Sequence, residues 1–325
     1  MARMHVLVIT GLTLPTIDEG DVERIRQAAG PGSRVSVATS AEEALAAASD
    51  VEVILGSITP ALFRAAPSLR WVHTITSGVD AFLFPEMRDS DVVLTSEKGI
   101  VGEHLADHAF ALLLALTRGI AKTVRYGDAV WEHRMEFRRS NVELTGMTMG
   151  IVGLGGTGRA VAHRAGAFGM RCRAVDIDPV HPTTACPLVQ DMTRFDELLA
   201  DSDVLAICCP LTAESRGLVG RHALARIKPG AYIVNVTRGP IIDDAALLEA
   251  LRSGRVAGAG LDVVPDEPLP RDHPFWTAPN IVMTPHTAGA SQFRAGRNIE
   301  RFCGNLRRLR EGAELEGAID KHRGF

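Results

Sequence analysis

The chain has 325 residues, which is too long for one hydrophobic core and a suitable length for two domains. Hydrophobic residues make up 46% of the chain and charged residues 23%, and this composition argues against a disordered protein. The net charge of −4 argues against binding to nucleic acid or to an anionic membrane surface.

The five cysteines follow no disulfide or zinc-site spacing, and Cys208 and Cys209 lie in an apolar run that predicts their burial. The first residues lack the pattern of a secretory signal. The longest apolar helix candidate, 105–116, falls short of the roughly 20 residues of a membrane span. We therefore expect a protein of the reducing cytoplasm without a membrane segment.

Short β-branched runs alternate with helical patterns along most of the chain, and this alternation predicts parallel α/β sheets. In the first part we expect strands at 5–10, 35–38, 53–55, 71–75 and 92–95, with helices around 21–29 and 42–48. A long helix is expected at 102–118. It is apolar on more than one face, and a subunit partner is one candidate for covering it.

A second α/β series follows a polar, irregular segment at 126–148. Its six expected strands, separated by helices, match a complete dinucleotide-binding sheet. These strands are 149–153, 172–176, 204–208, 231–235, 258–263 and 281–283. The last helical stretch, 290–309, has no strand after it, so it could return to cover the first domain.

A glycine-rich turn joins the first strand of this series to a helix. Gly153, Gly155 and Gly158 form a G-x-G-x-x-G pattern in the sequence GIVGLGGTG. In such a motif the first glycine permits a tight turn, the second lets the backbone approach a pyrophosphate, and the third lets the helix pack against the strand. Gly156 and Thr157 would supply the helix N–H groups that face the phosphates.

An acidic residue ends the next expected strand. Asp176 follows Gly153 at the spacing where a carboxylate accepts hydrogen bonds from the ribose hydroxyls. A carboxylate there repels a 2′-phosphate, and no Arg or Lys follows at once in DIDPV to receive one. We therefore expect NAD rather than NADP as cofactor, with Asp178 as the rival residue for this role.

Three polar residues follow successive strands, at the edge where a doubly wound sheet binds ligands: Arg238, Glu267 and His286. Arginine binds a carboxylate bidentately and stays charged, and histidine exchanges protons near neutral pH. A carboxylate beside an imidazole raises its pKa, and we expect Glu267 to act so on His286. The set suits hydride transfer between a nicotinamide and a 2-hydroxy acid, with Arg238 on the substrate carboxylate and carbonyl and His286 as acid and base.

Other candidate residues have plainer interpretations. His104 and His108 share a helix face, as zinc ligands do, but no third ligand is identifiable and the reaction needs no metal, so we expect none. Trp131 and Trp276 are expected to be packing or interface residues rather than substrate contacts.

Seven segments of the chain form a recognisable set: TSGVD (76–80), GEHLADHAFALLLALTR (102–118), GLGGTG (153–158), CPLTAESRGLVG (209–220), IKPGAYIVNVTRGPIIDDAALLEALRSG (227–254), GLDVVPDEPLP (260–270) and TPHTAG (284–289). In these segments, and over essentially its whole length, the chain resembles the NAD-dependent D-isomer-specific 2-hydroxyacid dehydrogenases, the family of the D-glycerate, hydroxypyruvate/glyoxylate, D-lactate and phosphoglycerate dehydrogenases. Two positions depart from the family: Thr237 replaces a smaller Ala or Gly, and Lys98-Gly99 replaces a commoner Pro-Gly.

This resemblance implies functions for individual residues. Arg238, Glu267 and His286 would be catalytic, and backbone groups of the turn Ser77, Gly78 and Val79 would bind the substrate carboxylate. Asp262 would contact the nicotinamide carboxamide. Further cofactor contacts would come from Gly156, Thr157, Asp176, Cys209, Val236, Thr237, His286 and Gly289.

The resemblance also implies an α/β fold of two doubly wound parallel-sheet domains. Residues 1–98 and 290–325 would form a discontinuous, flavodoxin-like substrate domain, and residues 99–289 a Rossmann NAD-binding domain. A homodimer through the nucleotide domain would bury the apolar surface of 102–118. The expected substrate is a small 2-keto or 2-hydroxy acid such as glyoxylate or hydroxypyruvate. Because the sequence stops at 325, we do not expect a regulatory domain of the long phosphoglycerate dehydrogenases.

Two alternatives remain open. One is an NAD(H)-sensing protein, similar to the corepressors built on this scaffold, that binds the dinucleotide without significant turnover. The other is a related enzyme that oxidises formate. The pairing of Glu267 with His286 argues against the second alternative, because the formate enzymes that the chain resembles lack that acid.

Overall fold

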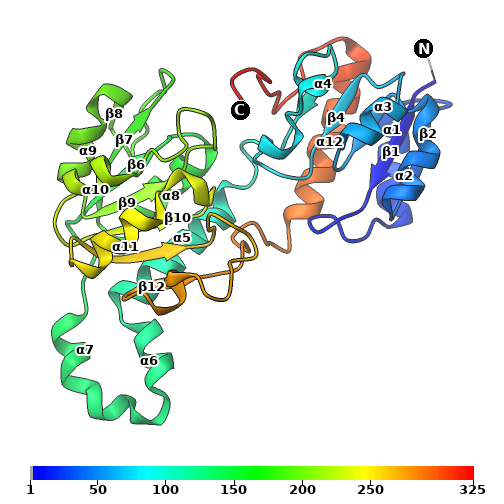
Figure 1. Ribbon diagram of the computed structural model, residues 1–325. Coiled ribbons are helices and arrows are strands. Elements are labelled where there is room, and N and C mark those ends of the chain that lie inside the picture. Colours follow the sequence, from blue (N-terminus) through cyan, green and yellow to red (C-terminus); the bar gives the residue numbers. More distant parts are fainter. Residues whose placement is uncertain (1–2) are drawn as a thin grey trace. The chain divides into compact units, whose positions relative to one another are not determined.

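The computed structural model describes residues 3–325, and they form two compact units (Figure 1). Unit 1 contains the chain up to Val101 and the returning segment Ala290–Phe325, and unit 2 contains Gly102–Gly289. The first division therefore follows Val101, whereas the sequence predicted it after residue 98. Among residues 3–325, no helix is both long enough and apolar enough to cross a membrane.

Unit 1 is built on a five-stranded sheet in the order β2-β1-β3-β4-β5, and every pair of neighbouring strands is parallel. This is the flavodoxin-like order. Its strands are β1 (His5–Ile9), β2 (Arg34–Ala38), β3 (Val53–Leu55), β4 (Trp71–His73) and β5 (Val93–Thr95). Its helices are α1 (Glu19–Ala29), α2 (Ala41–Ala47), α3 (Pro60–Ala65), α4 (Pro85–Arg88) and α12 (Arg294–Glu311).

Side chains alternate between the two faces of this sheet along each strand, and helices cover both faces. Val6 and Val8 of β1 pack with α1 and α12 in one core, whereas Leu7 packs with α2, α3 and α4 in the other. Phe302 of α12 stacks on Trp71 of β4 with 4.9 Å between ring centroids. The returning helix therefore completes the core of unit 1, as the lack of a following strand indicated.

Unit 2 is built on a seven-stranded parallel sheet in the order β12-β11-β10-β9-β6-β7-β8. Its strands are β6 (Thr148–Val152), β7 (Arg171–Asp176), β8 (Leu188–Asp191), β9 (Val204–Ile207), β10 (Ala231–Asn235), β11 (Val256–Leu261) and β12 (Ile281–Met283). Its helices are α5 (Gly102–Thr117), α6 (Ile120–Tyr126), α7 (Arg134–Ser140), α8 (Gly156–Ala167), α9 (Phe195–Asp201), α10 (Arg221–Arg226) and α11 (Asp244–Arg252). The predicted fold class of two parallel-sheet α/β domains is confirmed.

The order of strands reverses between β6 and β9, and a doubly wound sheet binds its ligands at the carboxyl ends of the strands beside such a point. Along β9, Leu205 and Ile207 face the core that α9, α10 and α11 cover. Val204 and Ala206 face the opposite core, which α5 and α8 cover.

Helix α5 is apolar on several faces because it packs against both α8 and the sheet within unit 2, where Leu112 and Leu113 are buried. A subunit partner over the remaining apolar surface of this helix stays a prediction. The structure corrects two other expectations. The segment expected to be irregular contains α7, which forms with α6 an arm that extends from unit 2 (Figure 1). The sheet also has a seventh strand, β8, a half-exposed edge strand without a continuous apolar run.

Candidate active site

The glycine motif forms the turn between β6 and α8. Gly153 has a φ of 90°, in the left-handed region that favours glycine, and its N–H donates to the carbonyl oxygen of Val175 at 2.8 Å. A Cβ at Gly158 would lie 2.1 Å from the carbonyl oxygen of Gly153, so α8 approaches the turn closely only without a side chain there. At Gly155 a Cβ would have no described heavy atom within 4 Å. The turn thus leaves open space at the start of α8, as a pyrophosphate site requires.

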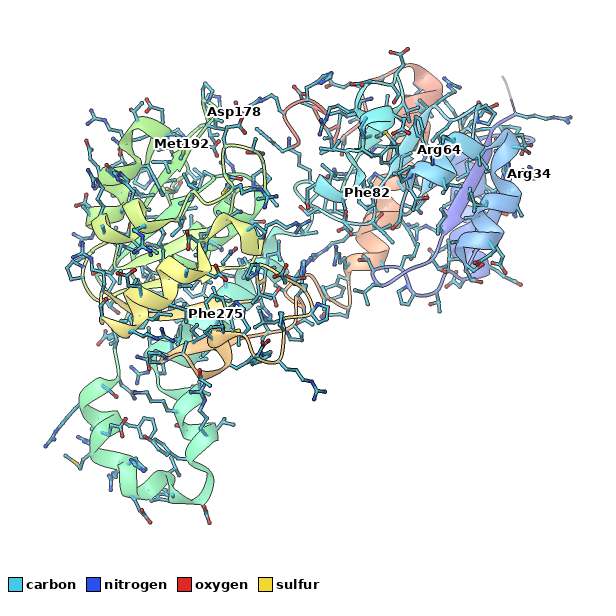
Figure 2. The ribbon with its side chains drawn as sticks, in the orientation of Figure 1. Arg34, Arg64, Phe82, Asp178, Met192 and Phe275 are labelled. Carbon is cyan, nitrogen blue, oxygen red and sulfur yellow. The ribbon has the colours of Figure 1, made fainter. Side chains whose placement is uncertain are left out.

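Asp176 ends β7 and lies against this turn. Its Oδ2 accepts a hydrogen bond from the N–H of Leu154 at 2.7 Å, and its Oδ1 accepts one from the N–H of Asp178 at 3.1 Å. Asp178 lies in the loop after β7 (Figure 2). The carboxylate that contacts the glycine motif therefore belongs to Asp176.

Cys209 follows β9, on the other side of the point where the strand order reverses. A Cβ at Gly153 would lie 2.9 Å from the Cα of Cys209, so the two strand ends are in close contact. Burial, together with a smaller effect of the nearby Asp176 carboxylate, raises the pKa of the Cys209 thiol to about 12. The side chain at this strand end is therefore a neutral thiol at physiological pH.

The loop after β10 carries Val236, Thr237 and Arg238. Asn235, the fully buried last residue of β10, holds this loop: its Oδ1 accepts from the N–H of Thr237 at 3.1 Å, and its Nδ2 donates to the carbonyl oxygen of Arg238 at 2.9 Å. The Arg238 guanidinium donates to the carbonyl oxygen of Thr237 at 2.9 Å. Asn235 was not among the predicted site residues, although an amide ending a buried strand was a usable signal.

His286 and Glu267 form a hydrogen-bonded pair. The Nδ1 of His286 lies 2.6 Å from Oε2 of Glu267, and both side chains are partly exposed. The other carboxylate oxygen of Glu267 accepts from the N–H of Val264 at 3.2 Å. Because Nδ1 is engaged with the carboxylate, the Nε2 of His286 is the ring nitrogen available for proton exchange.

The loop that carries Arg238 lies next to the loop that carries Glu267. A Cβ at Gly239 would lie 2.0 Å from the carbonyl oxygen of Val264, so the loop of Arg238 packs directly on the loop that leads to Glu267. Arg238, Glu267 and His286 follow the adjacent strands β10, β11 and β12. Unit 2 therefore gathers a guanidinium, a carboxylate and an imidazole at one edge of its sheet.

Asp262 lies beneath the loop that carries His286. Its side chain is fully buried, and its oxygens accept from the Thr284 hydroxyl at 2.6 Å and from the N–H groups of Thr287 and Ala288, both at 2.8 Å. Burial raises the pKa of Asp262, but hydrogen bonds from His108, Thr284, Ala288 and Thr287 together hold that pKa below its ordinary value. The carboxylate is therefore an anchor for the loop, and its expected contact with a cofactor carboxamide stays a prediction.

The backbone of His286 reflects this anchoring. Its φ is 53°, a left-handed conformation uncommon outside glycine, and its N–H donates to the carbonyl oxygen of Asp262 at 2.8 Å. His108 of α5 joins the same network, with its Nε2 2.7 Å from the Thr284 hydroxyl. In residues 3–325, no three His, Cys, Asp or Glu side chains are grouped to hold a metal ion. The contact of His108 with Thr284 was not predicted, because His108 had been weighed only as a metal ligand.

The turn Ser77, Gly78 and Val79 belongs to unit 1 and follows β4. Val79 is buried, Ser77 is exposed, and the carbonyl oxygen of Gly78 accepts from the Thr76 hydroxyl at 2.9 Å. The turn therefore presents its backbone at the carboxyl edge of the unit 1 sheet.

Residues 110–288 match the family model described as the NAD-binding domain of D-isomer specific 2-hydroxyacid dehydrogenases. The chain is also 36% identical over 272 residues to a glyoxylate reductase from Korarchaeum cryptofilum, covering 81% of this chain and 79% of the relative. The chain belongs to the D-isomer specific 2-hydroxyacid dehydrogenase family.

Two further relatives agree with this assignment. A glyoxylate reductase from Thermofilum pendens is 33% identical over 291 residues, covering 87% of this chain and 85% of the relative. The crystal structure of a D-isomer specific 2-hydroxyacid dehydrogenase from Xanthobacter autotrophicus, in complex with NADPH and MES, has a TM-score of 0.81 and 28% identity. That match covers 98% of this chain and 99% of the other.

As a member of the D-isomer specific 2-hydroxyacid dehydrogenases, the protein is an oxidoreductase that acts on CH–OH groups, and unit 2 contains its NAD-binding domain. The predictions of family and enzyme class are confirmed.

Proposed function

We propose that the protein transfers a hydride between NAD(H) and a small D-2-hydroxy acid or its 2-keto acid, with glyoxylate and hydroxypyruvate as the first substrates to test. The observation that carries this proposal is the His286–Glu267 hydrogen bond of 2.6 Å at the ligand-binding edge of an NAD-binding sheet. The similarity to the glyoxylate reductases from Korarchaeum cryptofilum and Thermofilum pendens supports the substrate class.

Each of the three side chains has a distinct proposed function. Arg238 binds the substrate carboxylate and the carbonyl oxygen, because a guanidinium stays charged and offers two parallel donors. His286 donates a proton from Nε2 to the carbonyl oxygen during reduction and accepts it from the hydroxyl during oxidation. Glu267 stabilises the imidazolium through its bond to Nδ1 and fixes the ring orientation.

The glycine turn fits a dinucleotide, because open space at Gly155 adjoins the start of α8. We propose that Gly153, Gly155, Gly156, Thr157 and Gly158 hold the pyrophosphate. Bound there, a nicotinamide dinucleotide supplies or accepts the hydride. The remaining proposed contacts are Asp176 on the ribose hydroxyls, Cys209, Val236 and Thr237 along the strand ends, and Asp262, His286 and Gly289 near the nicotinamide.

NAD is the proposed cofactor because the Asp176 carboxylate, placed at the end of β7, would repel a 2′-phosphate. The NADPH bound by the Xanthobacter relative makes this a point to measure in the present protein. For the substrate carboxylate we propose a second set of donors, the backbone N–H groups of Ser77, Gly78 and Val79 in unit 1.

The test is a spectrophotometric panel in which glyoxylate, hydroxypyruvate, pyruvate and bulkier 2-keto acids are each combined with NADH and with NADPH. We expect NADH-dependent reduction of at least one small 2-keto acid. Binding of NADH without oxidation by any 2-keto acid would instead support the NAD(H)-sensing alternative. Production of NADH from formate would support the formate-oxidising one.

Three variants, one of them a control, test the residue functions within the active protein. His286→Ala should leave NADH binding intact while kcat falls by about 10²–10⁴-fold. Glu267→Gln should lower kcat by about tenfold or more, whereas Asp266→Asn, at the neighbouring exposed acid, should not. Loss of NADH binding in His286→Ala would mean that this residue is structural.

We also propose a homodimer formed through unit 2, and exposed apolar side chains on the α6–α7 arm support it. Val124 and Trp131 on this arm are 75% and 76% exposed, which is unusual for large apolar side chains that are close together in sequence. The expected substitution test is Val124→Asp with Trp131→Asp, which should convert dimer to monomer in sedimentation equilibrium. A monomeric wild-type protein would refute the dimer.

A further inference from the structure

Glu97 is a fully buried carboxylate in unit 1, two residues after β5. Removing a carboxylate from water costs free energy unless it is paired and hydrogen-bonded. Such a pair is only weak support for stability, because apolar side chains of similar volume often stabilise a core as well. The position of this carboxylate therefore needs an explanation other than stability alone.

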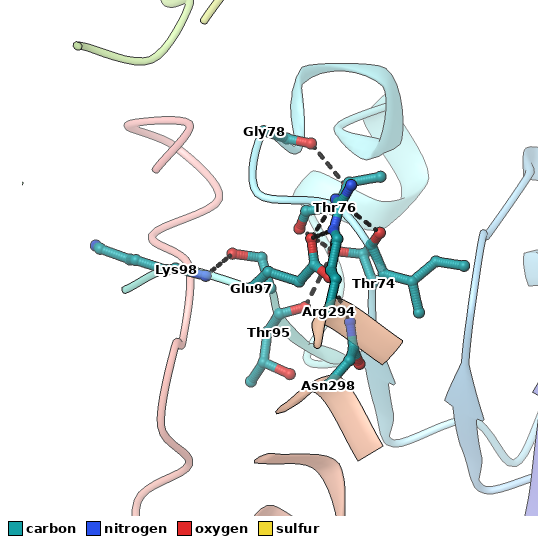
Figure 3. Close-up of polar contacts among 10 residues, drawn as sticks. Thr74, Thr76, Gly78, Thr95, Glu97, Lys98, Arg294 and Asn298 are labelled. Atoms are coloured by element: carbon teal, nitrogen blue, oxygen red, sulfur yellow. Dashed lines mark hydrogen bonds and ion pairs between the residues drawn. The ribbon is translucent and has the colours of Figure 1, made fainter. Parts of the chain in front are cut away.

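The partners of Glu97 lie on the first turns of α12 (Figure 3). Arg294 and Asn298 are four residues apart, so they share one face of that helix. The Nε of Arg294 lies 3.0 and 3.1 Å from the two carboxylate oxygens of Glu97, and its Nη2 donates to Oε2. The Nδ2 of Asn298 donates to Oε1 at 2.7 Å. Both carboxylate oxygens are thereby hydrogen-bonded.

Glu97 and Arg294 also form hydrogen bonds with the backbone around the turn after β4. The N–H of Glu97 donates to the carbonyl oxygen of Thr76 at 3.1 Å, and the Nη2 of Arg294 lies 3.4 Å from the carbonyl oxygen of Ile75. The Thr76 hydroxyl then donates to the carbonyl oxygen of Gly78 (Figure 3). This chain of bonds connects the ion pair to the turn 77–79.

The charges of this cluster matter for an anion bound at the turn. A buried carboxylate without its cation would repel a substrate carboxylate across a medium that screens poorly. His73, a neighbour of Asn298, does not supply a positive charge, since burial lowers its pKa to about 3. Arg294 is in direct contact with Glu97 and cancels its charge.

We propose that the Glu97–Arg294 pair positions the substrate-binding turn of unit 1: Arg294 holds the turn backbone and at the same time neutralises the carboxylate beneath it. Arg294 and Glu97 are thus positioning residues that act on substrate affinity rather than on proton or hydride transfer. This inference rests on the proposed function of the turn 77–79 as a carboxylate site.

The experiment compares four variants of the full chain by steady-state kinetics and NADH binding. Arg294→Gln should raise KM for the 2-keto acid by about 10- to 100-fold, with kcat within about threefold of wild type and NADH affinity unchanged. Arg294→Lys, which retains the charge but not the fork, should recover part of that KM. The double variant Glu97→Gln with Arg294→Gln should lower KM relative to Arg294→Gln alone, because the buried negative charge is gone.

Arg301→Gln is the matched control. Arg301 lies on the same helix, is 18% exposed compared with 17% for Arg294, and pairs with Glu316 at 3.2 Å. This variant should lose stability without a change in KM. Amide hydrogen exchange of the segment 74–79 should be faster in Arg294→Gln than in Arg301→Gln.

The outcomes separate this inference from the proposed function. Active wild-type protein with an unchanged KM in Arg294→Gln, or with an equal rise of KM in Arg301→Gln, would overturn the inference alone. A double variant with the same or a higher KM than Arg294→Gln would overturn the electrostatic part. Wild-type protein that reduces no 2-keto acid would overturn the proposed function and this inference with it.

Discussion

Replacing Asp262 by Asn tests whether this residue holds the loop that carries His286. The substitution keeps the shape of the side chain but removes its charge and one acceptor. If the new NH₂ group takes the place of Oδ1, it faces the donors of Thr284 and Thr287. In the place of Oδ2 it faces only the N–H of Ala288. The second orientation therefore costs less, and it leaves one buried N–H without an acceptor.

The expected cost follows from these bonds. An orphaned buried N–H, together with the loss of a charged acceptor for the remaining donors, should destabilise the loop by about 2–4 kcal/mol. Since about 1.4 kcal/mol corresponds to a factor of ten, amide exchange in the segment 284–289 should be about 30- to 1000-fold faster. Because His286 lies in this segment, kcat should also fall by about tenfold or more.

The assay is amide hydrogen exchange of the native protein, read by mass spectrometry over peptides that contain 284–289. Asp203→Asn is the control, because Asp203 also accepts from a backbone N–H in unit 2, that of Thr148 at 2.8 Å, but does so at the start of β6. The control should leave both the exchange of 284–289 and kcat unchanged. Wild-type exchange rates in Asp262→Asn would refute the reasoning.

Three further predictions concern pH, cofactor choice and the glycine turn. The pKa of Asp262 is lowered in the folded protein. The stabilisation by its carboxylate is therefore complete above the ordinary pKa of 3.8 and is lost as the pH falls through the lower folded value. Between about pH 5 and about pH 3, the free energy of unfolding measured in urea should fall more in wild type than in Asp262→Asn. Asp176→Asn should shift kcat/KM toward NADPH by about tenfold or more, whereas Asp178→Asn should not; an equal shift in both variants would remove the special function of Asp176. Gly158→Ala should weaken NADH binding by about tenfold or more in calorimetry, because its Cβ would collide with the Gly153 carbonyl oxygen; the control Gly166→Ala, whose Cβ would meet only Ala185 at 4.0 Å, should bind normally.

Much of the architecture was predictable because both sheets are covered on both faces. Strands such as β9, in which all four residues are buried, give continuous apolar runs that periodicity detects. The edge strand β8 was missed because its residues are exposed or half-exposed and its sequence, LVQD, contains only two apolar residues. The arm was missed for a related reason: its helices bury no residue fully, so they have no apolar stripe.

The placement of Asp176, Arg238 and His286 at or after strand ends was predictable from the sequence, and their functions stay proposals. Contacts of the site between partners that are distant in sequence were not predictable. His108 meets Thr284 across 176 positions, and Glu97 meets Arg294 across 197. Nothing in the local pattern of either segment indicates these contacts, because they depend on how separate elements pack around a shared core.

The discontinuity of unit 1 has a consequence for biosynthesis. Ile299, Phe302 and Leu306 of α12 belong to the same core as Trp71, but a ribosome makes these three residues only after the whole of unit 2. Unit 2 can reach its native state while the earlier segment of unit 1 still lacks that helix. During translation this sheet face, which α1 covers only in part, therefore stays partly exposed while residues 102–289 are synthesised, and in this interval the nascent protein is most exposed to aggregation.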